Sequence, residues 1–405
     1  MSAPVVRRVQ FQNAARKAMP IEVADPLIDV SGGWRATTWL GAPAPGGLAL
    51  PAAHPTASWL YAPRGVHLGE VGGEQILVAA DTGNHRVMIW HGIPDTDEAP
   101  CDVVLGQPDA VSEGPAAGGT STRTGMFLPT GVLVHDGMLI VADAWHHRIL
   151  IYGSVPTSGN PEPDLILGQD DLDHVEANRG GDCAGGTLYW PFGVNVVGGR
   201  MYVTDTGNRR VLGWSGGVPT SDIAPDIVLG QGDADHHEEN RGGPAGASSF
   251  RWPHSIAGTD ELLLIADAGN HRLLGWEPHP DADRDADFVR GQLDFETASE
   301  LPYAPQDRNT LRFPYGVDID GGRLAVADTA NNRILLWDDL PAAGAEYSAN
   351  AVLAQATFSA NGENRWDLVG RDTLCWPYGT SLRGDTLAVA DSGNNRIVLW
   401  RRDPQ

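Results

Sequence analysis

One turn sequence recurs six times along the chain at nearly constant spacing. Its first copy is Asp81-Thr82-Gly83-Asn84-His85-Arg86, and the general pattern is Asp-x-Gly-Asn-x-Arg, with substitutions inside the second and fifth copies. The copies begin at Asp81, Asp143, Asp205, Asp267, Asp328 and Asp391, so the spacings are 62, 62, 62, 61 and 63 residues. A fixed period of this length is typical of chains in which each repeat forms one unit of a larger ring or array.

Each repeat carries four short strand signals. The first follows an apolar or aromatic residue and a proline, as in Leu128-Pro129-Thr130-Gly131-Val132; the second and third flank the repeated turn. The third ends in an aromatic residue in every copy: Trp90, Tyr152, Trp214, Trp276, Trp337 and Trp400. The fourth is marked by Leu-Gly-Gln or a close variant, as at 105–107. Four short strands per repeat make one propeller blade. The sequence therefore predicts an all-β fold, a six-bladed β-propeller of four-stranded blades.

The repeated turn resembles the NHL repeat, and the added Leu-Gly-Gln strand resembles the long-blade bacterial NHL proteins. The resemblance extends over most of the chain and implies a propeller. It implies little about activity, because NHL propellers include RNA-binding domains, protein-interaction platforms and lyase or lactonase-like enzymes. Fold alone does not carry function from one protein to another.

The two ends of the chain predict how the ring closes. The sixth repeat stops at Trp400-Arg401-Arg402 without a fourth strand, while Thr37-Thr38-Trp39-Leu40-Gly41 has the pattern of a fourth strand without a repeat. Pairing the two would remove the open sheet edges of blade six. We expect a single propeller domain over 31–402, preceded by an N-terminal arm over 1–30.

The amino-acid composition limits the classes of binding partner that the protein is expected to have. The formal net charge is -24, with 52 acidic against 28 basic residues, so the average surface repels phosphate backbones and anionic lipids. We expect no nucleic-acid and no membrane partner. The three cysteines, Cys101, Cys183 and Cys375, are too few and too scattered for a disulfide framework, and no long apolar stretch or export signal is evident. These features predict free thiols and a cytoplasmic protein.

Propeller topology places the repeated turns and the long connection from each fourth strand to the next blade at the same end of the ring. The residue after each first-strand proline should then surround the channel mouth at that end: Arg64, Thr130, Phe192, His254, Tyr315 and Tyr378. Farther along the same strands, His67, Asn195 and Asp318 should lie in the channel wall. We expect Arg64, His67, Phe192, Asn195, His254, Tyr315, Asp318 and Tyr378 to bind a ligand at the channel mouth. The alternative is that these side chains fill the axis with mutual hydrogen bonds and water.

The repeated turn itself is interpreted as structural. We expect its aspartate to accept backbone N–H bonds in the turn and its arginine to pair with that aspartate. The turn histidines His85, His147 and His271 are replaced by Arg209, Asn332 and Asn395 in the sister copies. A catalytic set would not be distributed in this way.

Two neighbouring connections carry matching acidic, histidine-containing segments, at 171–181 and 233–243. A divalent metal site could use side chains from both segments: His174, Glu176, His236, His237 and Glu238. Their spacing fits no established metal motif, and such loops are more often solvated. We therefore predict no metal and no cofactor, with zinc or calcium as the alternative.

Sequence motifs for catalysis are absent: there is no phosphate-binding glycine loop, no Gly-x-Ser-x-Gly and no HExxH. We therefore predict a binding or scaffold module for a protein partner or small ligand, acting through the face that carries the repeated turns. The alternative is a lyase or hydrolase-type propeller enzyme, possibly metal-dependent, with its site at the channel mouth.

Overall fold

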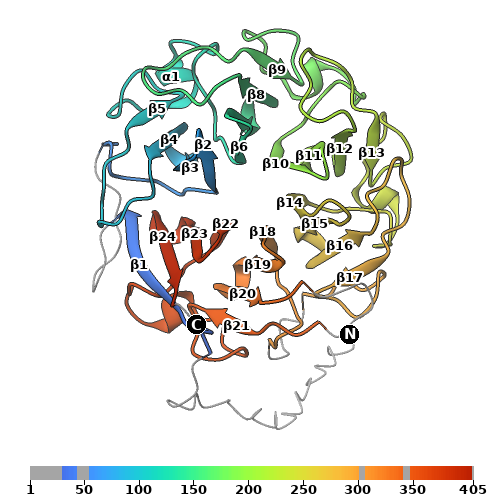
Figure 1. Cartoon of the computed structure of the whole chain (residues 1–405). Helices are drawn as coiled ribbons and strands as arrows, with labels where there is room; N and C mark the ends of the chain where they lie inside the picture. Colours follow the sequence, from blue (N-terminus) through green and yellow to red (C-terminus); the bar gives the residue numbers. More distant parts are fainter. Residues whose placement is uncertain (1–29, 43–53, 301–305, 341–346, 404–405) are drawn as a thin grey trace, which may run out of the picture.

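In the computed structural model, which describes residues 30–42, 54–300, 306–340 and 347–403, six four-stranded antiparallel sheets are arranged in a ring around a central axis (Figure 1). The innermost strands are β2 (Gly65–Val71), β6 (Val132–His135), β10 (Pro191–Val197), β14 (Pro253–Gly258), β18 (Pro314–Asp320) and β22 (Pro377–Arg383). The second strands are β3 (Glu74–Asp81), β7 (Met138–Asp143), β11 (Arg200–Asp205), β15 (Leu263–Asp267), β19 (Arg323–Asp328) and β23 (Thr386–Asp391). The predicted fold class is confirmed.

The outer half of each blade follows the repeated turn. The third strands are β4 (Arg86–His91), β8 (Arg148–Tyr152), β12 (Arg210–Trp214), β16 (Arg272–Trp276), β20 (Arg333–Trp337) and β24 (Arg396–Arg402). The fourth strands are β5 (Val103–Leu105), β9 (Leu165–Leu167), β13 (Ile227–Leu229), β17 (Phe288–Arg290), β21 (Ala351–Leu353) and β1 (Trp34–Gly41). Strand β1 pairs with β24, so an N-terminal strand closes the last blade as the sequence predicts. The predicted arm lies outside the described residues except for Val30.

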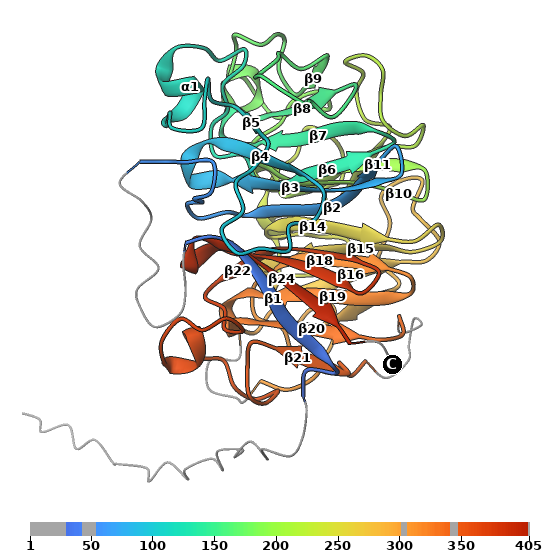
Figure 2. The ribbon, with the colours of Figure 1, turned by 60° about the vertical axis from the view of Figure 1, so that its left-hand side comes forward.

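Short helical turns connect the strands. Between the second and third strands of the blades lie η1 (Thr82–Asn84), η2 (Ala144–His146), η4 (Thr206–Asn208), η6 (Ala268–Asn270), η7 (Thr329–Asn331) and η9 (Ser392–Asn394). The long connections between blades contain α1 (Pro115–Gly119), η3 (Ala177–Gly180), η5 (Glu239–Gly242) and η8 (Glu363–Trp366). Both sets belong to one end of the ring, which we call the turn face. In the side view α1 projects from this face, and the described C-terminal end lies on the opposite side (Figure 2).

The core lies between blades. Six hydrophobic clusters each join two neighbouring blades, and each contains one of the aromatic residues that end the third strands. Trp276, for example, packs from β16 onto residues of β11 and β12 in the preceding blade. Truncating such a buried aromatic ring costs roughly 3–5 kcal/mol. This packing between neighbouring blades explains why every third strand carries an aromatic residue near its end.

The Leu-Gly-Gln signal joins the fourth strand to the turn face. The glycine has positive φ, for example +91° at Gly106, a conformation that glycine adopts without strain. The following Gln107 is buried, and its Nε2 donates to the carbonyl oxygens of Asn84 at 3.2 Å and Gly114 at 2.8 Å. The glutamine therefore ties a repeated turn to the connection that leaves the same blade.

Candidate functional site

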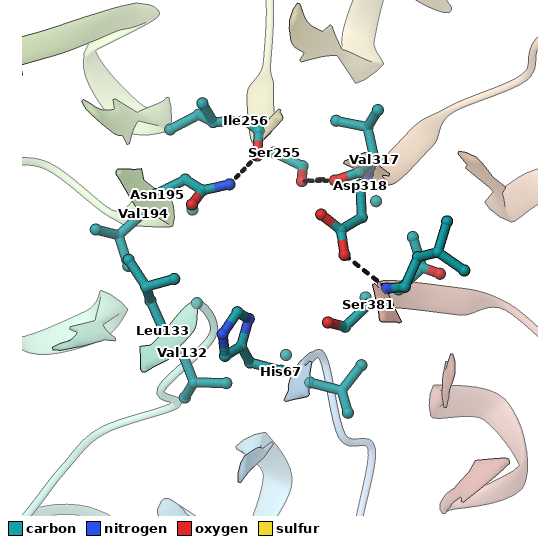
Figure 3. A pocket seen from close by; sticks show the side chains of 18 of the residues that line it. His67, Val132, Leu133, Val194, Asn195, Ser255, Ile256, Val317, Asp318 and Ser381 are labelled. Carbon is teal, nitrogen blue, oxygen red and sulfur yellow. Dashed lines mark hydrogen bonds between the residues drawn. The ribbon is translucent and has the colours of Figure 1, made fainter. Parts of the chain in front are cut away.

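The six innermost strands line an axial cavity of about 320 Å³ (Figure 3). Polar side chains project into this cavity at one level from four of the blades: His67, Asn195, Asp318 and Ser381 (Figure 3). Each stands three residues after the channel-mouth position of its own blade. This common register places them near the middle of the strands.

The predicted mouth residues form a packed cluster at the turn-face end of the cavity. The ring centroids of Phe192 and His254 are 4.2 Å apart, those of His254 and Tyr315 are 4.4 Å apart, and those of Tyr315 and Tyr378 are 4.6 Å apart. Phe192 and Tyr378 belong to opposite blades, yet their centroids are separated by only 6.4 Å. Arg64 lies over the Tyr378 ring, 4.9 Å from its centroid. The rings therefore meet across the axis and narrow this end of the channel, while the cavity extends beneath them.

Side chains also link each innermost strand to the next. The Asn195 amide donates to the Ile256 carbonyl at 2.9 Å, and the Asp318 carboxylate accepts the Leu382 N–H at 2.6 Å. The four remaining blade junctions are joined by His67 with the backbone of Val134, Thr130 with Phe192, Ser255 with Val317, and Ser381 with Leu68. Most of the channel polar groups therefore have a structural partner, as the alternative interpretation expects. Their role in ligand binding stays a prediction.

Burial controls the charges along the channel. It lowers the pKa of His67 to about 4 and that of His254 to about 3, with Arg64 nearby also disfavouring the His254 cation. The Trp252 carbonyl oxygen, 2.9 Å from the His254 Nδ1, acts in the opposite direction, but burial prevails, and both imidazoles are neutral at physiological pH. Burial raises the pKa of Asp318 to about 7, against the effect of two backbone N–H donors and Ser381. Asp318 lies deep in the ring, but its carboxylate faces the cavity and is therefore still reached by water.

The repeated turns hold six buried ion pairs. In the first, Asp81 Oδ2 accepts from Arg86 Nε at 2.7 Å and from Asn84 Nδ2 at 2.8 Å, and both charged side chains are fully buried. The Arg86 guanidinium also donates to three backbone carbonyls. The other aspartate oxygen accepts the N–H of Tyr61, at 2.6 Å. The expectation that this N–H belongs to the turn itself is wrong, because it comes from the long connection entering the blade. In the turn, the Gly83 N–H donates to the Tyr61 carbonyl oxygen and the His85 N–H donates to the Thr82 carbonyl oxygen.

In five of the six turns, the residue before the turn arginine accepts a hydrogen bond from the next blade, and we call this contact the latch. This residue has positive φ in all six turns, a conformation that His and Asn adopt more readily than most residues. The Nδ1 atoms of His85, His147 and His271 accept the N–H of the residue before the next first-strand proline, at 3.0–3.2 Å. Asn332 and Asn395 accept the corresponding N–H through their amide oxygens. These histidines thus have a repeated structural role.

Exposed aromatic side chains gather on the turn face. They belong to the connections that enter blades one, three and six and to the turn of blade two, and the strongly exposed ones are Tyr61, Trp145, Tyr189, Trp366 and Trp376. Trp145 stands where the sister turns carry glycine or alanine, and it packs on Phe127, with centroids 5.6 Å apart. Sequence reasoning missed this set, although the substitution of Trp for Gly in a repeated turn was a visible signal. It also missed Ser381, which the common register of the innermost strands identifies.

The paired acidic segments do not assemble a metal centre. Within the described ranges, no group of three or more His, Cys, Asp or Glu side chains is arranged to hold a metal ion. His174 and His236 are exposed and each contacts an aspartate of its own segment, Asp171 and Asp233. The other proposed ligands, Glu176, His237 and Glu238, lie in the same exposed segments. The two channel histidines, His67 and His254, likewise belong to no such group in the part of the chain that the structure describes.

These features define the class of protein, a six-bladed β-propeller with four-stranded blades. No family model and no curated protein sequence matches the chain. Among solved structures it is similar to Raptor from Chaetomium thermophilum, at 11% identity and a TM-score of 0.44, covering 93% of this chain and 29% of that one. It is also similar to a catalytically inactive virginiamycin B lyase from Staphylococcus aureus, solved with quinupristin, at 10% identity and a TM-score of 0.41. That match covers 84% of this chain and 95% of the lyase. Both are likenesses of fold.

No helix in the described residues has the length and apolarity needed to cross a membrane.

Proposed function

We propose that this propeller is a binding module that docks a protein partner on its turn face. The observation that carries the proposal is Trp366, whose residue surface is 79% exposed although its backbone has φ of +59°. The equivalent positions in two sister connections are Gly180 and Gly242, with φ of +74° and +75°. A bulky residue in this conformation is strained. Folding favours glycine there, so the indole has another use.

Trp145 supports the same conclusion independently. It is 47% exposed, and the sister turns carry glycine or alanine at its position: Gly83, Gly207, Gly269, Ala330 and Gly393. The fold therefore requires no indole at this position either. Exposed tryptophan and tyrosine side chains are the residues that most often dominate the energy of protein interfaces.

The charge of the turn face indicates the chemistry of the partner. In each of the five inter-blade connections between 107 and 376, acidic residues outnumber arginines. Carboxylates next to exposed aromatic rings are suited to arginine and lysine side chains, through ion pairs and cation–π contacts. The partner surface is therefore basic. We also propose that the blades are of the NHL type, which rests on the six copies of the turn.

Affinity capture with three forms of the protein tests the docking surface. The double variant Trp145→Gly/Trp366→Gly keeps the net charge and introduces residues that sister blades already carry. The control, Ile223→Ser, changes an exposed apolar residue in a loop between the third and fourth strands, at the opposite end of the ring. A partner retained by the wild-type protein and by Ile223→Ser, but lost by the double variant, supports the proposal.

Cross-linking mass spectrometry then locates the contact. Cross-links from basic segments of the captured protein to the turn face are expected, and raising the salt concentration should weaken retention. Retention that is equal in all three forms, or cross-links confined to the opposite face, would show that the turn face is not the docking surface.

A further inference from the structure

We propose that the axial cavity binds a small zwitterion, with its ammonium group against Asp318 and its carboxylate toward Arg64. This site is separate from the turn-face surface and does not depend on it. The cavity, about 320 Å³, is at the lower end of the range for small-molecule sites. Polar side chains from four blades converge on it, which suits a ligand that carries charged groups.

The anionic end of the site is Asp318. The six buried turn aspartates each have an arginine Nε within 2.7–2.9 Å. Asp318 instead receives the backbone N–H groups of Leu382 and Ile319, and no cationic side chain of the described residues pairs with it. A carboxylate withdrawn from bulk water is stabilised by a cation, and an ammonium group in the cavity supplies one.

The cationic end of the site is Arg64. Its guanidinium has no ion pair in the described part of the chain, and its buried Nε has no hydrogen-bond partner there. Arg64 lines the same cavity. Its position on the innermost strand precedes the His67 level by three residues, or about 10 Å of extended backbone before the side chains reach inward. Two unpaired charges of opposite sign thus stand at two levels of one cavity.

The remaining titratable groups of the cavity do not neutralise either the negative charge at Asp318 or the positive charge at Arg64. At the middle level His67 is neutral, because burial lowers its pKa to about 4. At the narrowed turn-face end His254 is neutral for the same reason, and burial raises the pKa of the Tyr315 phenol. Strand β10 contributes no titratable side chain to the lining.

The rim opposite the turn face provides the way in. His135, Asp320 and Arg383 lie there at the ends of β6, β18 and β22, and all three retain solvent exposure. Arg383 pairs with Glu70 at 2.5 Å, so it does not neutralise Asp318. The lining between rim and cluster includes Val132, Leu133, Val194, Ile256 and Val317 (Figure 3). Their side chains belong to the hydrophobic clusters between blades, so the ligand is held mainly through its two charged ends, and the chain between them only has to span the distance from Asp318 to Arg64.

Isothermal titration calorimetry on the full chain tests the proposal with β-alanine, γ-aminobutyrate and ε-aminocaproate as probes. Hexylamine and hexanoate, which carry one charge each, are the controls. We expect one zwitterion to bind at least tenfold more tightly than either control at pH 8. Because binding requires ionised Asp318, its affinity should fall about tenfold between pH 8 and pH 6.

Two variants separate the ends of the site. Arg64→Thr introduces the residue that Thr130 already provides in the second blade, and Asp318→Asn introduces the residue that Asn195 provides in the third. Each should weaken the best zwitterion at least tenfold. Only Asp318→Asn should also remove the pH dependence, and equal melting temperatures would verify folding.

Three results would overturn the proposal. They are the absence of binding by all three zwitterions, equal binding of the single-charge controls, and binding by the two variants within twofold of the wild-type protein. If a variant does not fold, the pH dependence of the wild-type protein still decides, because pH-independent binding contradicts a role for Asp318.

Discussion

The aspartates of the repeated turns and Asp318 in the channel both lie inside the ring, but only the turn aspartates are paired with a cationic side chain among the described residues. Each turn carboxylate is fully buried against an arginine that also donates to backbone carbonyls. Asp318 contacts backbone N–H groups and Ser381 but no cation among the described residues. The turn pair occurs six times and Asp318 once.

This difference separates residues that build the ring from residues that the ring can do without. A compensated charge repeated in every blade is needed wherever a blade is made. The Asp318 carboxylate accepts the Leu382 N–H across a blade junction, but a neutral side chain does the same work at other junctions, so the fold does not require an uncompensated charge there. Such exceptions to local consistency concentrate at functional sites. Trp366 is a second exception of this kind: the fold favours glycine at its position, as at Gly180 and Gly242, yet one connection carries a tryptophan.

The largest expected effect comes from breaking a turn pair. Arg86→Met leaves Asp81 buried without its cation and leaves three backbone carbonyls without a donor. We expect the free energy of unfolding to fall by about 4 kcal/mol, measured by chemical denaturation. The matched channel variant, Asp318→Asn, should change it by no more than about 1 kcal/mol, since it removes an uncompensated charge and one acceptor. Equal losses in the two variants would erase the distinction between the two kinds of aspartate.

A smaller effect should come from the latch histidines. Partial burial lowers the pKa of His271 to about 4, below the ordinary unfolded value of about 6.5, so the folded state binds fewer protons. The stability from this group is present above pH 6.5 and is lost as the pH falls toward 4. The loss should be on the order of 2 kcal/mol after allowing for solvent screening.

His271→Asn is the informative variant for this latch, because Asn332 and Asn395 make the same contact in the fifth and sixth blades. Its free energy of unfolding should equal that of the wild-type protein at pH 7.5. At pH 4.5 it should lose less of this free energy than the wild-type protein does, as measured by equilibrium denaturation at both pH values. An unchanged pH profile would mean that His271 does not contribute to acid sensitivity.

The fold could be predicted because its causes are repeated. The proline before each innermost strand, the turn, the aromatic end of the third strand and Leu-Gly-Gln each occur at a fixed register, and β1 was recognisable because the sixth blade lacked a fourth strand. Each signal depends on local conformation or on contact with the adjacent blade. A single repeat therefore contains nearly all the information needed for its own structure.

The candidate sites were less predictable because they depend on several blades at once. Whether Phe192, Tyr315 and Tyr378 form the walls of a pocket or meet across the axis depends on the combined size of side chains from different repeats. The latch role of His85 depends on a backbone N–H that follows it by 43 residues. The charge balance around Asp318 similarly requires the positions of all neighbouring strands.

The smallest expected effect is on Trp366, and it has the opposite sign. Trp366→Gly relieves a positive φ that costs roughly 1–2 kcal/mol for a residue with a side chain, while glycine increases the entropy of the unfolded chain. The net result should be a rise in unfolding free energy of up to about 1 kcal/mol. Trp366→Ala removes the same indole but keeps the strain, so it should be less stable than Trp366→Gly. Both variants should lose the docked partner equally. If Trp366→Gly were instead clearly less stable than the wild-type protein, the indole would be part of the ring's framework, and the strain would no longer indicate a binding role.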